Sequence, residues 1–162
     1  MKAAFFGGAK SDRTTKEYSD TIRIGEILYE NGYEVKCGGY YGLMEAISIG
    51  NRYAIGVICR SIGPDNGNIY LNDTIITEDI YDRLRILIED TDLFIVQKGG
   101  LGTLAELFLT LDIMRKRKNV SRIILIGEFW RDIFNSINIL LNEREMDMII
   151  IIDDIEKLNK II

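Results

Sequence analysis

Residues 93–106 read Leu-Phe-Ile-Val-Gln-Lys-Gly-Gly-Leu-Gly-Thr-Leu-Ala-Glu, and this stretch decides the fold. Its four leading apolar residues predict a buried strand, and the glycines that follow predict a tight turn. A helix is expected to begin at Thr103. Its unpaired N–H groups and positive dipole end favour anions, and the glycine backbone allows a ligand to come close. The segment therefore predicts a strand, a phosphate-binding turn and a helix.

The rest of the chain repeats this alternation of strands and helices. Strands are predicted at 2–6, from Val35, and at 53–59, 74–76, 93–97, 122–126 and 148–152; helices are predicted at 16–31, 42–49, 80–89, 103–115, 130–140 and 155–160. The segment 60–68, with the one proline of the chain, predicts a loop. We expect one Rossmann-like, doubly wound α/β domain over residues 1–162. Its mainly parallel sheet should have about six or seven strands flanked by helices.

Glycine turns follow three of these strands, and parallel strands bring such turns to one edge of the sheet. They are Gly7-Gly8, Gly38-Gly39 and the turn formed by Gly99, Gly100, Leu101 and Gly102. Taken alone, Gly7-Gly8 fits a plain tight turn as well as a ligand turn. The spacing matches neither the dinucleotide fingerprint nor a Walker motif, which argues against NAD binding and ATP hydrolysis.

Composition narrows the classes of function. The net charge of −5 argues against a nucleic-acid polymer as partner, and no apolar run is long enough to span a membrane. Histidine is absent, and the two cysteines are isolated, so we expect no metal site and no disulfide framework. We also expect no cofactor and a cytoplasmic location. Chemistry would have to come from carboxylates, arginine, hydroxyls and the backbone.

Glu106 has two interpretations that spacing alone cannot separate. Thr103 and Glu106 have the spacing of a capping box, in which the glutamate returns to the helix N-terminus. Alternatively, Glu106 faces a ligand and pairs with a cation, for which Arg83 is the candidate, although a lone arginine usually lies on the surface. The helix is apolar around most of its circumference, so either its neighbours cover it or it packs on a second subunit; we expect a homodimer. Its apolar residues are Leu104, Leu107, Phe108, Leu109, Leu111, Ile113 and Met114.

Two motifs together resemble the lysine decarboxylase-like family, better known as the Lonely Guy nucleoside 5′-monophosphate phosphoribohydrolases, in its short prokaryotic branch. Residues 98–106 correspond to the family motif Pro-Gly-Gly-x-Gly-Thr-x-x-Glu, and residues 37–44 correspond to a glycine-rich turn followed by Gly-Leu-Met. The resemblance covers roughly residues 3–127. Three positions depart from the family pattern: Lys98 replaces proline or glycine, Cys37 replaces a glycine, and Ala105 occupies a position that is often acidic.

The resemblance implies a catalytic pair, Arg83 and Glu106. It implies hydrolysis of the N-glycosidic bond of a nucleoside 5′-monophosphate to the free base and ribose 5-phosphate. The alternative is a protein of the same fold that binds or carries a nucleotide or a molybdenum-cofactor-like molecule without cleaving it. The expected phosphate- and nucleotide-binding residues are Gly7, Gly8, Gly39, Gly42, Met44, Lys98, Gly99, Gly100, Leu101, Gly102 and Thr103.

Overall fold

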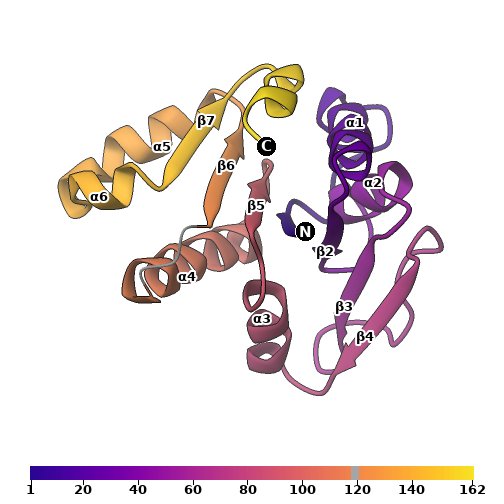
Figure 1. Ribbon diagram of the computed structural model, residues 1–162. Helices are drawn as coiled ribbons and strands as arrows, with labels where there is room; N and C mark the ends of the chain where they lie inside the picture. The colour runs from indigo at the N-terminus through magenta and orange to yellow at the C-terminus, as the bar shows by residue number, and fades with distance from the viewer. Residues whose placement is uncertain (118–120) are drawn as a thin grey trace.

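The protein contains one seven-stranded sheet whose strands all run parallel, as seen in a computed structural model that describes residues 1–117 and 121–162 (Figure 1). The strand order is β4-β3-β2-β1-β5-β6-β7. The strands are β1 (Lys2–Phe6), β2 (Glu34–Cys37), β3 (Ile55–Cys59), β4 (Asp73–Thr77), β5 (Leu93–Val96), β6 (Arg122–Ile126) and β7 (Ile149–Ile152). The prediction of a doubly wound α/β fold is confirmed.

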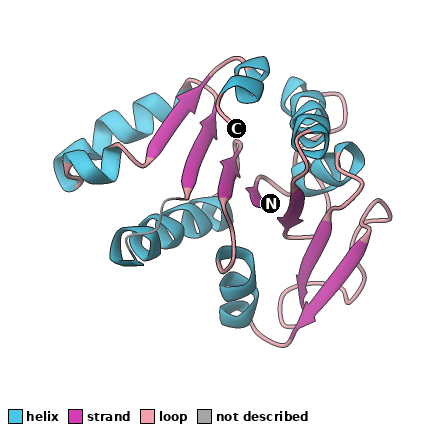
Figure 2. Ribbon diagram, viewed as in Figure 1, coloured by secondary structure: helices cyan, strands magenta, loops and turns pink. Residues whose placement is uncertain are grey.

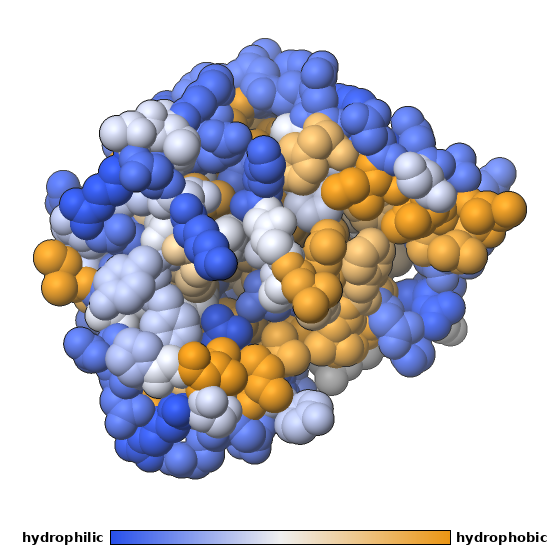
Figure 3. All heavy atoms as spheres, turned by 180° about the vertical axis from the view of Figure 1, so that it is seen from behind, coloured by the Kyte–Doolittle hydropathy of each residue, from blue (hydrophilic) through white to orange (hydrophobic). Residues whose placement is uncertain are grey.

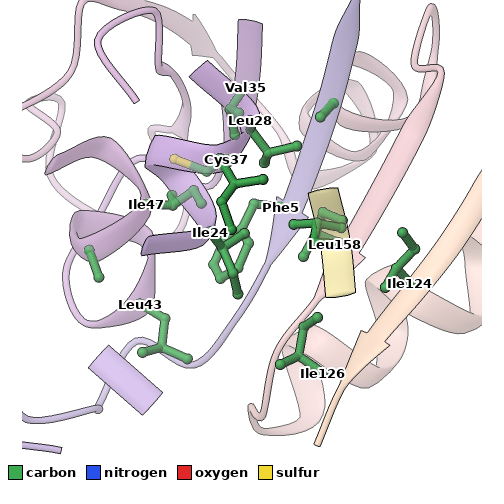
Figure 4. Packing of buried hydrophobic residues seen from close by; sticks show 14 of the residues in the cluster. Phe5, Ile24, Leu28, Val35, Cys37, Leu43, Ile47, Ile124, Ile126 and Leu158 are labelled. Carbon is green, nitrogen blue, oxygen red and sulfur yellow. The ribbon is translucent and has the colours of Figure 1, made fainter. Parts of the chain in front are cut away.

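Helices cover both faces of the sheet (Figures 1 and 2). They are α1 (Lys16–Glu30), α2 (Leu43–Gly50), α3 (Ile80–Ile88), α4 (Leu101–Arg117), α5 (Phe129–Ile137) and α6 (Glu143–Met146), with 3-10 helices η1 (Asn138–Leu140) and η2 (Ile155–Lys160). Side chains alternate along a strand, so Phe5 packs with α1, α2 and η2, while Ala4 and Phe6 pack with α3, α4 and α5. Figure 4 shows the first of these two cores, to which Phe5 from β1, Ile24 from α1 and Leu158 from η2 all belong.

The direction of the strand order reverses at β1. From β1 the chain proceeds through β2, β3 and β4 to one edge of the sheet, and β5 pairs with the opposite side of β1. In open parallel sheets, ligands bind at the carboxyl ends of the strands that flank such a reversal. The two loops that leave this point are the glycine turn after β1 and the motif turn after β5.

Several predicted boundaries are wrong. The third strand begins at Ile55 rather than at residue 53, because the Ala54 carbonyl accepts backbone bonds from residues 72 and 73 and Tyr53 packs on the Tyr29 ring instead. The helix predicted at 130–140 ends at Ile137 and continues as η1. The short helix α6 was not predicted. It starts at a capping box formed by Asn142 and Glu145.

Candidate active site

A cavity of about 690 Å³ opens where β1 and β5 end. Its wall combines the loop after β1, the motif turn, the first turns of α1 and α4, and single side chains from α2 and α3. A volume of this size lies within the usual range for small-molecule sites. The lining residues are Gly7, Gly8, Ala9, Lys10, Ser11, Thr15, Glu17, Met44, Arg83, Lys98, Gly99, Gly100, Leu101, Gly102, Thr103 and Glu106.

The motif turn brings its backbone to the cavity. α4 begins at Leu101, so the N–H groups of its first turn have no partner four residues earlier. Gly99 could not be another residue without rearrangement, because an added Cβ would lie 2.1 Å from Thr103 Oγ1. Gly100 and Gly102, by contrast, both line the cavity and have open space where a Cβ would be added. Backbone donors and the positive helix end together suit an anionic group.

The start of α4 corrects two predictions. The helix begins at Leu101, not at Thr103, because the Gly100 carbonyl already accepts a bond from the N–H of Leu104. Thr103 therefore lies inside the first turn and is not the N-cap. The capping-box interpretation is wrong as well: the Glu106 carboxylate accepts a hydrogen bond from Arg83.

Arg83 is held in the interior rather than on the surface. It lies in α3, whose N-cap Asp79 accepts bonds from the N–H groups of Tyr81 and Asp82. Only 6% of Arg83 is exposed. Its Nε donates to the Val57 carbonyl at 2.9 Å, and its Nη1 donates to Glu106 Oε1 at 3.2 Å. The guanidinium is thus fixed between the sheet and α4, with a side facing the cavity.

Burial and the neighbouring cation have opposite effects on Glu106. Its side chain is 13% exposed. Desolvation raises the pKa of the Glu106 carboxyl above its ordinary value, and this effect exceeds the opposing influence of the Arg83 guanidinium. A buried carboxylic acid with a raised pKa and one fixed cationic partner, facing a cavity, is typical of functional sites.

Gly38 makes room for this arginine. A Cβ at Gly38 would lie 2.2 Å from Arg83 Nη2 and 2.5 Å from Met44 Sδ. Gly39 and Gly42, the other glycines of this turn, lie against backbone instead. Gly39 packs on the backbone of Gly56, and Gly42 packs on the backbone of residues 8 and 9. Each has a positive φ, +78° and +65°, which glycine tolerates.

Most of the predicted site residues meet at the cavity. Met44 lines it, together with both predicted glycines after β1, the residues of the motif turn, Arg83 and Glu106; Gly39 and Gly42 do not line it. The sequence prediction missed Ala9, Lys10, Ser11, Thr15 and Glu17 as lining residues. Their position after the first glycine turn was a usable signal, since every loop at the carboxyl edge is a candidate.

Two lysines add positive charge to the cavity. Lys10 and Lys98 both line it, and neither has a carboxylate partner within the described residues. The Nζ of Lys98 lies 5.9 Å from the centre of the Phe129 ring, a cation–π distance. The two lysines and Arg83 outnumber the two carboxylates of the lining, Glu17 and Glu106, in a chain whose net charge is −5. Local charge therefore favours an anionic ligand.

Other kinds of site find no support in the described part of the chain. Residues 1–117 and 121–162 hold no cluster of three or more metal-binding side chains, and Cys37 and Cys59 are free and buried. Among the helices in these ranges, none has the length and apolar character needed to cross a membrane.

Comparison with known proteins shows which protein family this chain matches. The model of the family described as "Possible lysine decarboxylase" matches residues 38–162. An "Uncharacterized protein" of Archaeoglobus fulgidus is 28% identical over 113 residues, which are 68% of this chain and 74% of that protein.

Two solved structures share the fold. The molybdenum cofactor binding protein from Rippkaea orientalis has a TM-score of 0.75 at 21% identity, covering 99% of this chain and 93% of that one. The molybdenum cofactor carrier protein from Chlamydomonas reinhardtii has a TM-score of 0.74 at 16% identity, covering 99% and 94%. Because the family model spans more than half of the chain and includes Arg83 and the motif that ends at Glu106, the chain belongs to the family described as Possible lysine decarboxylase.

Proposed function

We propose that this protein hydrolyses the N-glycosidic bond of a nucleoside 5′-monophosphate, releasing the free base and ribose 5-phosphate. The observation that carries the proposal is the buried Arg83–Glu106 pair, 3.2 Å apart, at the same cavity as the glycine-rich helix start. The glycine-rich start of α4 suits a phosphate dianion. The same cavity presents a carboxylate fixed by a cation.

The motif turn would anchor the substrate through its phosphate. The N–H groups of Gly99 to Thr103 and the helix dipole suit the 5′-phosphate, and Lys98 adds a charge beside them. Binding energy from this remote group holds the sugar carbon in place for reaction, which is how a part of the substrate that does not react can raise the rate.

Glu106 would act on the sugar. Departure of the base leaves an oxocarbenium-like ribose, and a carboxylate beside it stabilises the developing positive charge and orients water. Arg83 would keep Glu106 ionised and in place, opposing the rise in the pKa of Glu106 that burial produces. Both roles depend on the geometry of the buried pair.

The experiment is incubation of the purified protein with nucleoside 5′-monophosphates, followed by chromatography for the free base. We expect base release that Arg83→Lys and Glu106→Gln each lower by at least ~10²-fold, the usual loss for a group that stabilises a transition state. Arg85→Lys is the matched control. Arg85 lies in the same helix and pairs with Asp82, but its side chain is 57% exposed and it does not line the cavity.

A carrier function is the second candidate, and the full-length structural likeness to two molybdenum cofactor proteins favours it. In that case the same cavity would hold a phosphorylated ligand without cleaving it. Tight binding of a nucleotide or of molybdenum cofactor, with no base released by the unaltered protein, would support the carrier function and reject hydrolysis.

The apolar groove between α3 and α4 supports the proposal of a homodimer. Within α4, Leu107, Leu111 and Met114 are buried, whereas Phe108 and Leu109 remain 37% exposed. Leu109 lines a groove of about 260 Å³ with Leu84 and other residues of α3. Figure 3, a view from behind, shows clusters of hydrophobic side chains at the surface. Light scattering should give twice 18.5 kDa, and Leu109→Glu should lower this mass to that of one chain.

A further inference from the structure

One wall of the cavity is a loop rather than a helix or strand. Lys10 and Ser11 line the cavity from the segment between β1 and α1, and Thr15 lines it from the N-cap of α1. These residues do not belong to the hydrophobic core, so core packing does not fix their position. Specific contacts must hold the loop for the cavity to keep its shape.

The first turn of α2 holds the beginning of this loop. The N–H of Leu43 donates to the Gly8 carbonyl at 2.9 Å, and the Gly8 N–H donates to the Lys98 carbonyl at 3.1 Å. The backbones approach so closely here that a Cβ at Gly42 would lie 2.5 Å from the Gly8 oxygen. The loop is therefore anchored to α2 and to the motif turn where it leaves β1.

Glu45, in the same turn of α2, holds the far end of the loop. Only 7% of Glu45 is exposed, yet it does not line the cavity. One carboxylate oxygen accepts a hydrogen bond from Arg13 Nη2, and the other accepts from the Tyr18 hydroxyl at 3.1 Å. Burial, and then the hydrogen bond that it donates to Glu45, raise the pKa of the Tyr18 hydroxyl. A buried carboxylate needs such partners, and charge-assisted bonds of this kind are among the stronger ones.

We propose that Glu45 is a positioning residue that, through Arg13, holds the loop 9–13 against α2 and so keeps Lys10 and Ser11 in the cavity wall. Arg13 makes this contact with its tip, while 65% of its side chain is exposed. Glu45 acts on the ligand only through the loop. The proposal rests on the proposed function for the identity of the ligand, but the state of the loop can be measured without it.

The experiment compares Arg13→Gln, Glu45→Gln and the double variant. Hydrogen–deuterium exchange of the amides of Thr14 and Thr15, which donate to Asp12 within the loop, should become roughly tenfold faster in each variant, since one charge-assisted bond is lost. The double variant should match the single ones, because both remove the same contact. Arg13→Gln alters a mostly exposed side chain and keeps the test valid if Glu45→Gln folds poorly. Glu26→Gln removes an exposed ion pair of α1 with Arg23 and should leave exchange of the loop unchanged.

The second readout is the ligand. For adenosine 5′-monophosphate we expect KM to rise roughly tenfold in Arg13→Gln while kcat stays within about threefold, because Arg83 and Glu106 lie on α3 and α4 and keep their contact. If the unaltered protein binds this nucleotide without releasing base, the proposed function fails, and the dissociation constant replaces KM. Unchanged loop exchange would overturn the role of Glu45. So would faster exchange with unchanged affinity for the nucleotide.

Discussion

Gly38→Ala is the sharpest test of how the Arg83–Glu106 pair is built. The added Cβ would lie 2.2 Å from Arg83 Nη2, whereas nonbonded contacts are comfortable at about 3.5 Å. The guanidinium must therefore shift by about 1 Å. Its bonds to Val57 and Glu106, now 2.9 and 3.2 Å long, cannot both survive such a shift at good length.

The expected result is a loss of activity larger than the loss of stability. A misplacement of about 1 Å among the groups that position the reacting atoms can lower the rate by ~10²-fold, so we expect kcat/KM for base release to fall by about that factor. Overpacking of this kind costs about 1–3 kcal/mol of unfolding free energy. Chromatography of the released base and urea denaturation measure the two effects separately.

Two further variants decide the cause. Gly63→Ala is a matched control: its Cβ would lie 2.7 Å from the Tyr40 ring, and neither residue lines the cavity. It should lose similar stability but keep kcat/KM. Met44→Ala combined with Gly38→Ala removes the 2.5 Å contact with Met44 Sδ and leaves the contact with Arg83. Recovery of activity in this double variant, or full activity in folded Gly38→Ala, would refute the reasoning.

Three other predictions concern charged groups. The activity of the unaltered protein should fall as pH decreases through the pKa of Glu106, which burial raises, because the carboxylate is the active form. The pH–rate profile of Glu106→Gln should lack this fall in activity at low pH. Burial lowers the pKa of Lys36 to about 8 from 10.5, so the unfolded chain binds more protons between these values. The unfolding free energy should therefore rise with pH over that range, as urea titrations at several pH values can measure. Lys36→Met should abolish this rise, although it also removes the hydrogen bonds to the Ile86 and Glu89 carbonyls. Lys98→Ala should raise KM roughly threefold at low salt, and this difference should shrink at ~1 M salt if Lys98 acts through its charge.

The order of the strands and helices could be predicted from the sequence, because local sequence features determine where each strand and helix forms. Apolar runs such as residues 93–96 bury a strand on both faces, and glycines end strands wherever the backbone must turn sharply. Parallel strands then force their following loops to one edge, so the glycine turn after β1 and the motif turn were expected to meet. The sequence did not predict a strand boundary correctly where an apolar side chain packs outside the sheet, as Tyr53 does on the Tyr29 ring.

The state of Glu106 was decided only by the tertiary structure. The capping-box interpretation and the interpretation of Glu106 as a ligand-facing carboxylate require the same residues at the same spacing. They differ in whether a cation from another helix lies within hydrogen-bond distance of the carboxylate. Arg83 is 23 residues away in the sequence, and the sheet and the glycine at position 38 bring it to Glu106. The same holds for Glu45, whose partners come from the loop after β1 and from α1. Periodicity and turn chemistry thus determine the fold. The pairing of buried charges depends instead on packing between segments that are distant in the sequence, and local sequence patterns do not predict that packing.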